Sequence, residues 1–221
     1  MLKRFTSLIT KVAFFASLAT VGSSVNAAVI SFTDEASFSL STSDSVLDTF
    51  NDLISFADGG DTLSSPLTRI IDSGSYDVDI DGIGVFIGSQ SIAPSGEEYI
   101  SNESVVDTIT ISNISGLPTY ALGGFLFGSN LTPIAANLTA TIFDLDGLAT
   151  SLSLSCDLNP ANCFFGFTSS VAIERLELSG DTNFIGLDDL RFANAAVVSA
   201  PASFYIVVLG AIALVLRRYK A

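Results

Sequence analysis

The sequence contains no histidine and no tryptophan, only two cysteines and only nine basic residues among 221. Without histidine, a Ser-His-Asp triad and a Cys-His pair are both excluded, and the usual general base and the commonest metal ligand are missing. Without tryptophan, the largest aromatic surface for stacking on a sugar is missing as well. Enzymes and metal sites that depend on these side chains are therefore ruled out.

The few basic residues lie mostly at the two ends of the chain, and the stretch between the ends is strongly acidic. All 23 acidic residues fall between Asp34 and Asp189. Only three basic residues share that stretch, which gives it a net charge of −20: Arg69, Arg175 and Arg191. A body with this charge repels phosphate backbones, so binding to nucleic acid is excluded.

The first 27 residues have the pattern of a secretory signal peptide. Basic residues come first, the apolar run 12–21 follows, and small residues then lead to Ala27. About ten apolar residues are too few to span a bilayer, which needs about 20. We therefore expect export through the Sec translocon and cleavage between Ala27 and Ala28.

The two cysteines are predicted to form a disulfide. Cys156 and Cys163 are separated by six residues that include the turn-forming pair Asn159-Pro160. A turn at this pair brings the two backbones close together, and disulfides persist in the compartments that exported proteins reach. The spacing is not that of a zinc site, and no histidine could complete the ligands.

The C-terminal residues 197–221 form a second targeting segment. The apolar run 204–216 is followed by Arg217 and Arg218, and the segment 201–216 would make about 24 Å of helix against a hydrocarbon core of about 30 Å. Basic residues after such a helix stay on the cytoplasmic side. We expect a transmembrane helix over 201–216, and one interpretation of it is a plain single-pass anchor.

The body between these segments, 28–196, consists of short alternating stretches separated by Gly, Pro, Asn, Asp and Ser, which is typical of β-strands. Only 34–40 could form one or two helical turns. The fold class is therefore predicted to be all-β, an antiparallel β-sandwich or jelly roll. Strands are expected at 29–33, 76–87, 105–112, 121–127, 138–143, 148–154, 163–168, 173–178 and 185–192.

Three short motifs in the body are interpreted structurally. The glycine pair at 123–124 indicates a bulge or a close approach of two backbones, and the Asp-x-Asp-Gly motif at 144–147 predicts a tight hairpin. The alternating aspartates at 77–82 match the first half of an EF-hand loop, but its twelfth position is Gly88 instead of glutamate. A solvated strand face is favoured there, and a shorter calcium site near Asp81 stays open.

The order of these features resembles a known family. A small motif containing Ala200 and Pro201, a short apolar helix and the cluster Arg217-Arg218, on a chain with a signal peptide, are similar to the PEP-CTERM sorting signal of Gram-negative bacteria. Strings of the body, the first at 31–38, are similar to the β-sandwich ectodomains of PEP-CTERM proteins. The resemblance implies processing by an exosortase, a membrane cysteine protease, in cells that make exopolysaccharide.

The body also resembles jelly-roll carbohydrate-binding domains, which often hold a structural Ca²⁺ with an aspartate of the last strand and oxygens of an early strand. Carried over to this sequence, the resemblance implies a calcium site at Asp188 and Asp189, with Asp48 or Asn51 at the start of an early strand as partners. The alternative is an ion pair between Asp189 and Arg191, which lie two residues apart on one strand face. Apart from calcium, no cofactor is expected.

These observations leave three functions open. The favoured one is an exported, non-enzymatic protein of the cell surface or the exopolysaccharide matrix, anchored in the inner membrane before processing. The second is a calcium-dependent carbohydrate-binding module, whose stacking side chains would be Tyr76, Tyr99 or Tyr120 because most phenylalanines are assigned to the core. A glycoside hydrolase or lyase is least favoured, since no compact pair of acids stands at an interpretable spacing.

Overall fold

The computed structural model describes residues 28–53, 61–72, 74–80, 84–88, 93, 98–105, 107–130, 132–181 and 184–196. The predicted signal peptide 1–27, including Ala27, lies outside the described residues. The predicted sorting signal 197–221, with Ala200, Pro201, Arg217 and Arg218, lies outside them as well. Within the described part of the chain, no helix has the length and apolar character that crossing a membrane requires.

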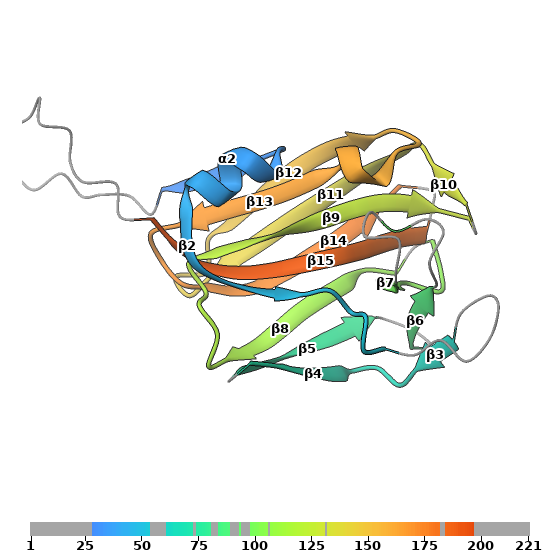
Figure 1. The fold of residues 1–221 in the computed structure, drawn as a ribbon, viewed down its shortest axis with the longest axis horizontal. Helices are drawn as coiled ribbons and strands as arrows, with labels where there is room; N and C mark the ends of the chain where they lie inside the picture. Colours follow the sequence, from blue (N-terminus) through green and yellow to red (C-terminus); the bar gives the residue numbers. More distant parts are fainter. Residues whose placement is uncertain are drawn as a thin grey trace, which may run out of the picture.

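Two antiparallel sheets pack face to face, which confirms the predicted β-sandwich (Figure 1). Sheet A has nine strands: β1 (Val29–Phe32), β2 (Thr42–Asp48), β3 (Asp61–Leu63), β6 (Val85–Gly88), β7 (Tyr99–Ser101), β9 (Ala121–Ser129), β10 (Pro133–Ile134), β13 (Phe164–Ser169) and β15 (Phe184–Ala195). Sheet B has six: β4 (Leu67–Ile71), β5 (Gly74–Ile80), β8 (Ile109–Ser115), β11 (Ala136–Asp144), β12 (Ala149–Cys156) and β14 (Ile173–Gly180). A short helix, α2 (Glu35–Leu40), and a single 3-10 turn, η1 (Pro160–Asn162), complete the described elements.

The core lies between the two sheets and follows from the alternation of side chains along each strand. In β5, Tyr76, Val78 and Ile80 are buried, while Asp77 and Asp79 lie on the opposite face. The carboxylate of Asp77 accepts hydrogen bonds from side chains of β4 and β8, the two strands that flank β5. The predicted strand face with outward acidic residues is therefore confirmed for this stretch.

The predicted helical turns at 34–40 form α2, which lies on the outer face of sheet A. Asp34 caps the helix, because its Oδ1 accepts a hydrogen bond from the backbone N–H of Ser37 at 2.8 Å. Phe38 is the buried residue of the helix and packs against the ring of Phe164 at a centroid distance of 5.4 Å. A Cβ atom at Gly166 would lie 2.5 Å from the Phe38 ring, so glycine is what lets the helix lie this close.

The glycine pair Gly123-Gly124 marks a close approach of two backbones, one of the two predicted alternatives, and lies opposite a bulge of the neighbouring strand. A Cβ at Gly123 would lie 2.9 Å from the carbonyl oxygen of Phe165 on the neighbouring strand. The bulge itself is in β15, whose register against β9 shifts between Asp188 and Arg191, opposite Gly124. This irregularity changes which face of the sheet the following residues of β15 occupy.

The hairpin and the disulfide predicted from the sequence are both present. Gly147 adopts a positive φ of 79°, and Oδ1 of the buried Asp144 accepts hydrogen bonds from the backbone of Asp146 and Leu148. The disulfide joins Cys156 at the end of β12 to residue 163, next to β13, with their Cα atoms 5.3 Å apart. Both half-cystines are buried.

The first half of the chain differs from the strand prediction. Asp48 ends β2 instead of starting a strand. The strands β2, β3 and β4 are absent from the strands that the sequence predicts. The stretch predicted as one strand at 76–87 contains two, β5 in sheet B and β6 in sheet A. The signal at β2 is weak because five of its seven residues are polar, Thr42-Ser43-Asp44-Ser45 and Asp48.

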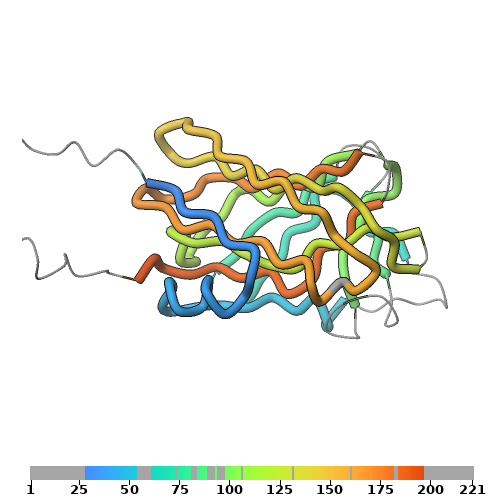
Figure 2. Tube along the Cα trace, turned by 90° about the horizontal axis from the view of Figure 1, so that it is seen from above, coloured from blue at the N-terminus to red at the C-terminus, as the bar shows by residue number. Residues whose placement is uncertain are grey.

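Both ends of the described body leave the sandwich on the same side. β1 begins and β15 ends at that side (Figure 2). The backbone N–H of Ala196 donates to the carbonyl of Ser41 at 2.9 Å, and that of Ala28 donates to the hydroxyl of Ser170 at 3.2 Å. The opposite end of the sandwich carries β3, β6 and β7 (Figure 1).

Candidate functional site

The outer face of sheet A carries a group of side chains that the core does not use, at the end formed by β6 and β7. In each strand the apolar neighbours of these residues point inward: Val85 and Ile87 in β6, Ile100 in β7, and Ile185 in β15 all belong to the core. Strand alternation therefore places the residues between them on the opposite face.

These outward residues line a cavity of about 300 Å³, which is the candidate functional site. Its walls come from four strands of sheet A and the loop after β7, so the two sheets and their core hold it in place. The lining residues are Phe86, Tyr99, Ser101, Asn102, Glu103, Ser129 and Phe184. The site thus combines three aromatic rings with hydroxyl, amide and carboxylate groups.

Glycines beneath the rings allow the aromatic side of this pocket to form. A Cβ at Gly88 would lie 2.1 Å from Cζ of Tyr99, and one at Gly186 would lie 2.2 Å from the ring of Phe127. The two rings meet edge to face at a centroid distance of 5.0 Å. Burial raises the pKa of the Tyr99 hydroxyl, and its hydrogen bond with Ser129 partly offsets that effect.

A buried asparagine fixes the loop that carries the polar side of the pocket. Oδ1 of Asn102 accepts a hydrogen bond from the backbone N–H of Ile185 at 2.7 Å. Its Nδ2 donates to the carbonyls of Ser104 at 2.7 Å and Asp107 at 2.9 Å. With every polar atom of its amide in use, Asn102 positions the loop and is not available to donate to a ligand.

Glu103 supplies the carboxylate among the described residues that line the pocket. It is partly exposed, and its Oε1 accepts a hydrogen bond from the hydroxyl of Thr62 in β3. The hydroxyl of Ser101 donates to the carbonyl of Asn102 at 3.2 Å. One carboxylate with hydroxyl neighbours and aromatic walls suits a neutral ligand rich in hydroxyl groups, which needs apolar faces and a few hydrogen-bond acceptors.

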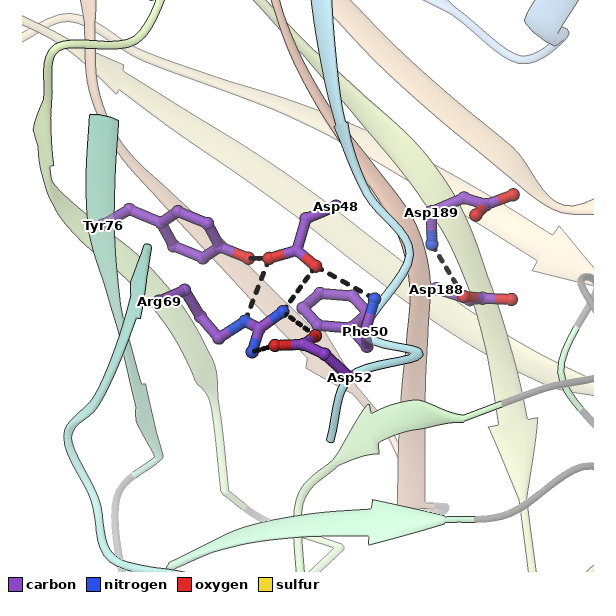
Figure 3. Close-up of polar contacts among 7 residues, drawn as sticks. All are labelled: Asp48, Phe50, Asp52, Arg69, Tyr76, Asp188 and Asp189. Atoms are coloured by element: carbon purple, nitrogen blue, oxygen red, sulfur yellow. Dashed lines mark hydrogen bonds and ion pairs between the residues drawn. The ribbon is translucent and has the colours of Figure 1, made fainter. Parts of the chain in front are cut away.

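Asp48, one of the four predicted calcium ligands, belongs instead to a buried ionic cluster (Figure 3). Its carboxylate accepts hydrogen bonds from Arg69 at 3.0 and 2.8 Å, from the hydroxyl of Tyr76 at 2.6 Å and from the backbone N–H of Phe50 at 2.9 Å. Arg69 also forms two hydrogen bonds with Asp52, at 3.1 and 2.6 Å. The cluster ties β2 of sheet A to β4 and β5 of sheet B.

Charge and burial oppose each other in this cluster. Burial favours the neutral form of Arg69, but its hydrogen bonds to Asp48 and Asp52 outweigh that effect and raise the pKa of the guanidinium above its ordinary value. The hydrogen bond with Arg69 lowers the pKa of Asp52 despite some burial. Burial, followed by the charge of Asp48, raises the pKa of the Tyr76 hydroxyl well above its ordinary value.

Asp188 and Asp189 lie beside β2 but outside this cluster, and their carboxylates point away from it (Figure 3). Asp188 is fully buried, and its Oδ1 accepts a hydrogen bond from the backbone N–H of Asp189 at 2.8 Å. Asp189 has a positive φ of 51° at the bulge. Burial raises its pKa, the charge of Arg191 partly offsets this, and the charge of Glu35 adds to it.

The structure does not gather the four predicted calcium ligands around one point. Asp48 is held by Arg69, and Asn51 is exposed in the turn after it. No group of three or more acidic or cysteine side chains is placed to hold a metal ion within the described ranges. Asp48 therefore does not fit the predicted calcium site. Calcium binding at Asp188 and Asp189 stays a prediction. The shorter calcium site considered at 81–82 lies outside the described residues.

The alternative interpretation, an ion pair between Asp189 and Arg191, is replaced by a different pairing. The guanidinium of Arg191 forms its ion pair with Glu35 in α2. The bulge between Asp188 and Arg191 breaks the regular alternation that the two-residue spacing assumed. Arg191 thus connects the last strand to the helix that covers sheet A.

The three tyrosines predicted to stack on a sugar have three different positions. Tyr76 is fully buried in the ionic cluster, which makes that prediction wrong for this residue. Tyr99 forms one wall of the pocket. Tyr120 is 43% exposed just before β9, near the end of the sandwich where the termini leave. Phe86 and Phe184 were not among the predicted site residues. The alternation along β6 and β15 nevertheless places their side chains on the face opposite the core.

Comparison with known proteins identifies no family for this chain. No protein-family model matches it, and no curated protein matches it either. Among solved structures it is similar to CsCBM6-3 from Clostridium stercorarium in complex with cellobiose, at 13% identity over 62% of this chain and 98% of that one, with a TM-score of 0.34. The CBM22-1 xylan-binding domain from Paenibacillus barcinonensis matches at 14% identity over 63% and 99% of the two chains, with a TM-score of 0.35.

Proposed function

We propose that the β-sandwich is an exported, non-enzymatic domain that binds a neutral carbohydrate in the pocket on the outer face of sheet A. The observation that carries the proposal is the composition of the pocket, whose described lining combines the rings of Phe86, Tyr99 and Phe184 with hydroxyl groups and the carboxylate of Glu103. A volume of about 300 Å³ is at the lower end of the range for small-molecule sites. It suits a short stretch of a glycan chain.

Binding without hydrolysis is supported by the acids of the pocket. Glycoside hydrolysis generally needs two carboxyl groups that flank the scissile bond. Glu103 is the only acidic side chain among the described residues that line the cavity, and it is engaged by Thr62. A second acid at a workable distance is therefore missing from the described lining, which favours a binding module over a glycosidase.

A neutral glycan is favoured because of charge. The stretch from residue 34 to residue 189 has a net charge of −20, and Glu103 adds a carboxylate inside the pocket itself. Uronic acids or sulfated sugars would be repelled by the net charge of the whole body and by the carboxylate of Glu103 in the pocket. Hydroxyl groups of a neutral sugar can instead donate to Glu103.

Export completes the proposal. The disulfide between Cys156 and Cys163 suits an oxidising compartment. The predicted signal peptide would deliver the chain across the inner membrane, and the PEP-CTERM-like tail would anchor it there until an exosortase processes it. The domain would then act at the cell surface or in the exopolysaccharide matrix of a Gram-negative bacterium.

The test is isothermal titration of the protein with neutral and acidic polysaccharides, in calcium and in EDTA. We expect binding to a neutral polysaccharide, at least about tenfold weaker in Phe184→Ala, because burying such a ring contributes about 1.5–3 kcal/mol. Tyr120→Ala, which removes an exposed aromatic ring far from the pocket, is the matched control and should bind normally. Equal affinity in both variants would refute the pocket, and release of reducing ends would refute binding without hydrolysis.

A further inference from the structure

The end of the sandwich from which both termini leave carries a concentration of exposed apolar side chains. We call this surface the terminal rim. It consists of residues 28–30, 40–43, 116–120, 144–148, 170–172 and 194–196. Leu40 is 86% exposed there, Leu145 65%, Ile30 56%, Leu148 49% and Tyr120 43%, five of the nine large apolar residues that are exposed in the described part of the chain.

Hydrogen bonds between loops show that these segments form one surface. The turn holding Leu145 and Leu148 is joined to the β13–β14 turn, because the backbone N–H of Leu145 donates to the carbonyl of Ala172 at 3.0 Å. The N–H of Ile173 donates to the carbonyl of Thr119 at 2.7 Å, which brings the loop before β9 alongside. Ala28 is bonded to Ser170 in the β13–β14 turn. Ala196 is bonded to Ser41, and the pairing of Ala193 with Ala121 places this end of β15 beside the loop before β9.

The sequence that follows the last residue of the rim indicates which surface the rim faces. The described body ends at Ala196, and only the seven residues 197–203 separate it from the uncharged apolar run 204–216. Fully extended, seven residues reach at most about 25 Å. The predicted transmembrane helix over 201–216, which contains this run, would therefore keep the terminal rim, and no other end of the sandwich, close to a bilayer.

We propose that the terminal rim rests on the membrane surface, with Leu145, Leu148 and Tyr120 placed in the interfacial layer of the bilayer. Exposed leucine and tyrosine side chains are the types that bind this layer, tyrosine at the level of the headgroups. Asp146 lies between the two leucines and is exposed, which limits the contact to the interface because a carboxylate is costly in hydrocarbon. The inference rests on the proposed membrane anchor and is independent of sugar binding.

The absence of tryptophan allows a direct test, since one introduced tryptophan is the only one in the protein. The full chain is reconstituted into phosphatidylcholine vesicles with brominated acyl chains, which quench tryptophan within the bilayer. The test variant is Leu145→Trp. The matched control is Leu158→Trp, because Leu158 is 68% exposed in the loop between the two half-cystines, away from the rim.

Flotation of the vesicles first shows whether the chain is anchored, and quenching then shows where the rim lies. We expect at least about twofold quenching of Leu145→Trp relative to Leu158→Trp, since interfacial side chains enter the headgroup and acyl boundary by about 5–10 Å. Equal quenching of the two variants in floated vesicles would overturn the inference while leaving the anchor intact. A chain that does not float would overturn the anchor and the inference together. A blue-shifted but unquenched Leu145→Trp would point to a protein partner and would also overturn it.

Discussion

Replacing Arg69 by methionine tests whether the buried ionic cluster holds the two sheets together. Arg69 is 5% exposed and Asp48 3%, and two of the hydrogen bonds that Asp48 accepts come from the guanidinium. Methionine keeps most of the apolar stem of arginine and removes its charge. The carboxylate of Asp48 would then stay buried with only the hydroxyl of Tyr76 and one backbone N–H as donors.

The expected loss of stability is large. Removing one partner of a buried ion pair costs about 3–5 kcal/mol, because it leaves the other charge buried and uncompensated. With an m-value of about 2 kcal/mol per molar urea, the unfolding midpoint should fall by about 1.5–2.5 M. Arg175→Met is the matched control. Arg175 is half exposed, pairs with Glu177 at 3.1 Å and lies 4.0 Å from the ring of Phe143, so its loss should cost less than about 1 kcal/mol.

The assay is urea unfolding of residues 28–196, followed by circular dichroism, for both variants and the parent. The difference between parent and Arg69→Met should narrow in acid. Arg69 lowers the pKa of Asp52 in the folded state, and a lowered carboxylate pKa gives stability that is present above the unfolded pKa and is lost as the pH falls through the folded pKa. A midpoint for Arg69→Met within error of that for Arg175→Met would refute the reasoning.

Three further outcomes are expected. Replacing Cys156 and Cys163 by alanine should lower the unfolding free energy by about 2–3 kcal/mol, the loop-closure entropy of so short a loop, and an unchanged urea midpoint would contradict this. Gly88→Ala should abolish sugar binding in titrations while circular dichroism stays native, because its Cβ would lie 2.1 Å from the Tyr99 ring; normal affinity would argue against that wall. Burial raises the pKa of Asp189 in the folded state. The contribution of this side chain to the free energy of unfolding is therefore fully present below the unfolded pKa and is lost as the pH rises through the folded pKa. Asp189→Asn should therefore unfold at a higher temperature than the parent at pH 7 in EDTA, but not at about pH 3; the same gain at both values would show that the carboxylate is not the cause.

The fold class could be predicted from the sequence because local patterns and tertiary packing agree in most strands. In β5, the alternation of Tyr76, Val78 and Ile80 with two aspartates already specifies which face is buried. Cys156 and Cys163 could be paired because their turn lies between them in the sequence. Each of these features depends on neighbours within about ten residues, which a single sequence displays directly.

The ionic cluster could not be predicted, because its members come from separate strands. Asp48 and Arg69 are 21 residues apart, and Asp48 and Tyr76 are 28 apart. β2 and β4, which carry the first two, lack a clear alternating pattern. Without those strands, Asp48 looks like an acidic residue free to bind a cation, and Tyr76 looks like an aromatic residue available to a sugar.

The aromatic walls of the pocket were missed for a different reason. Phenylalanine is usually buried, so the sequence favours a core position for most of the phenylalanines. The strand patterns contained a contrary signal, since Phe86 alternates with Val85 and Ile87, and Phe184 precedes the core residue Ile185. When a strand carries apolar residues on both faces, the outward ones need a cover of their own. That cover is either a helix, as α2 provides for Phe164 of β13 through Phe38, or a ligand.

The pocket and the terminal rim lie at opposite ends of the same strands, which separates the two proposed contacts. β15 begins at Phe184 in the pocket and ends at Ala195 in the rim, and at about 3.3 Å per residue the strand places these two ends about 35 Å apart. That distance is several Debye lengths at physiological salt. Headgroup charges therefore have little influence on the pocket, and sugar affinity should be the same for the anchored and the released protein. Processing by an exosortase would then change where the pocket is presented and leave the affinity of its binding unchanged.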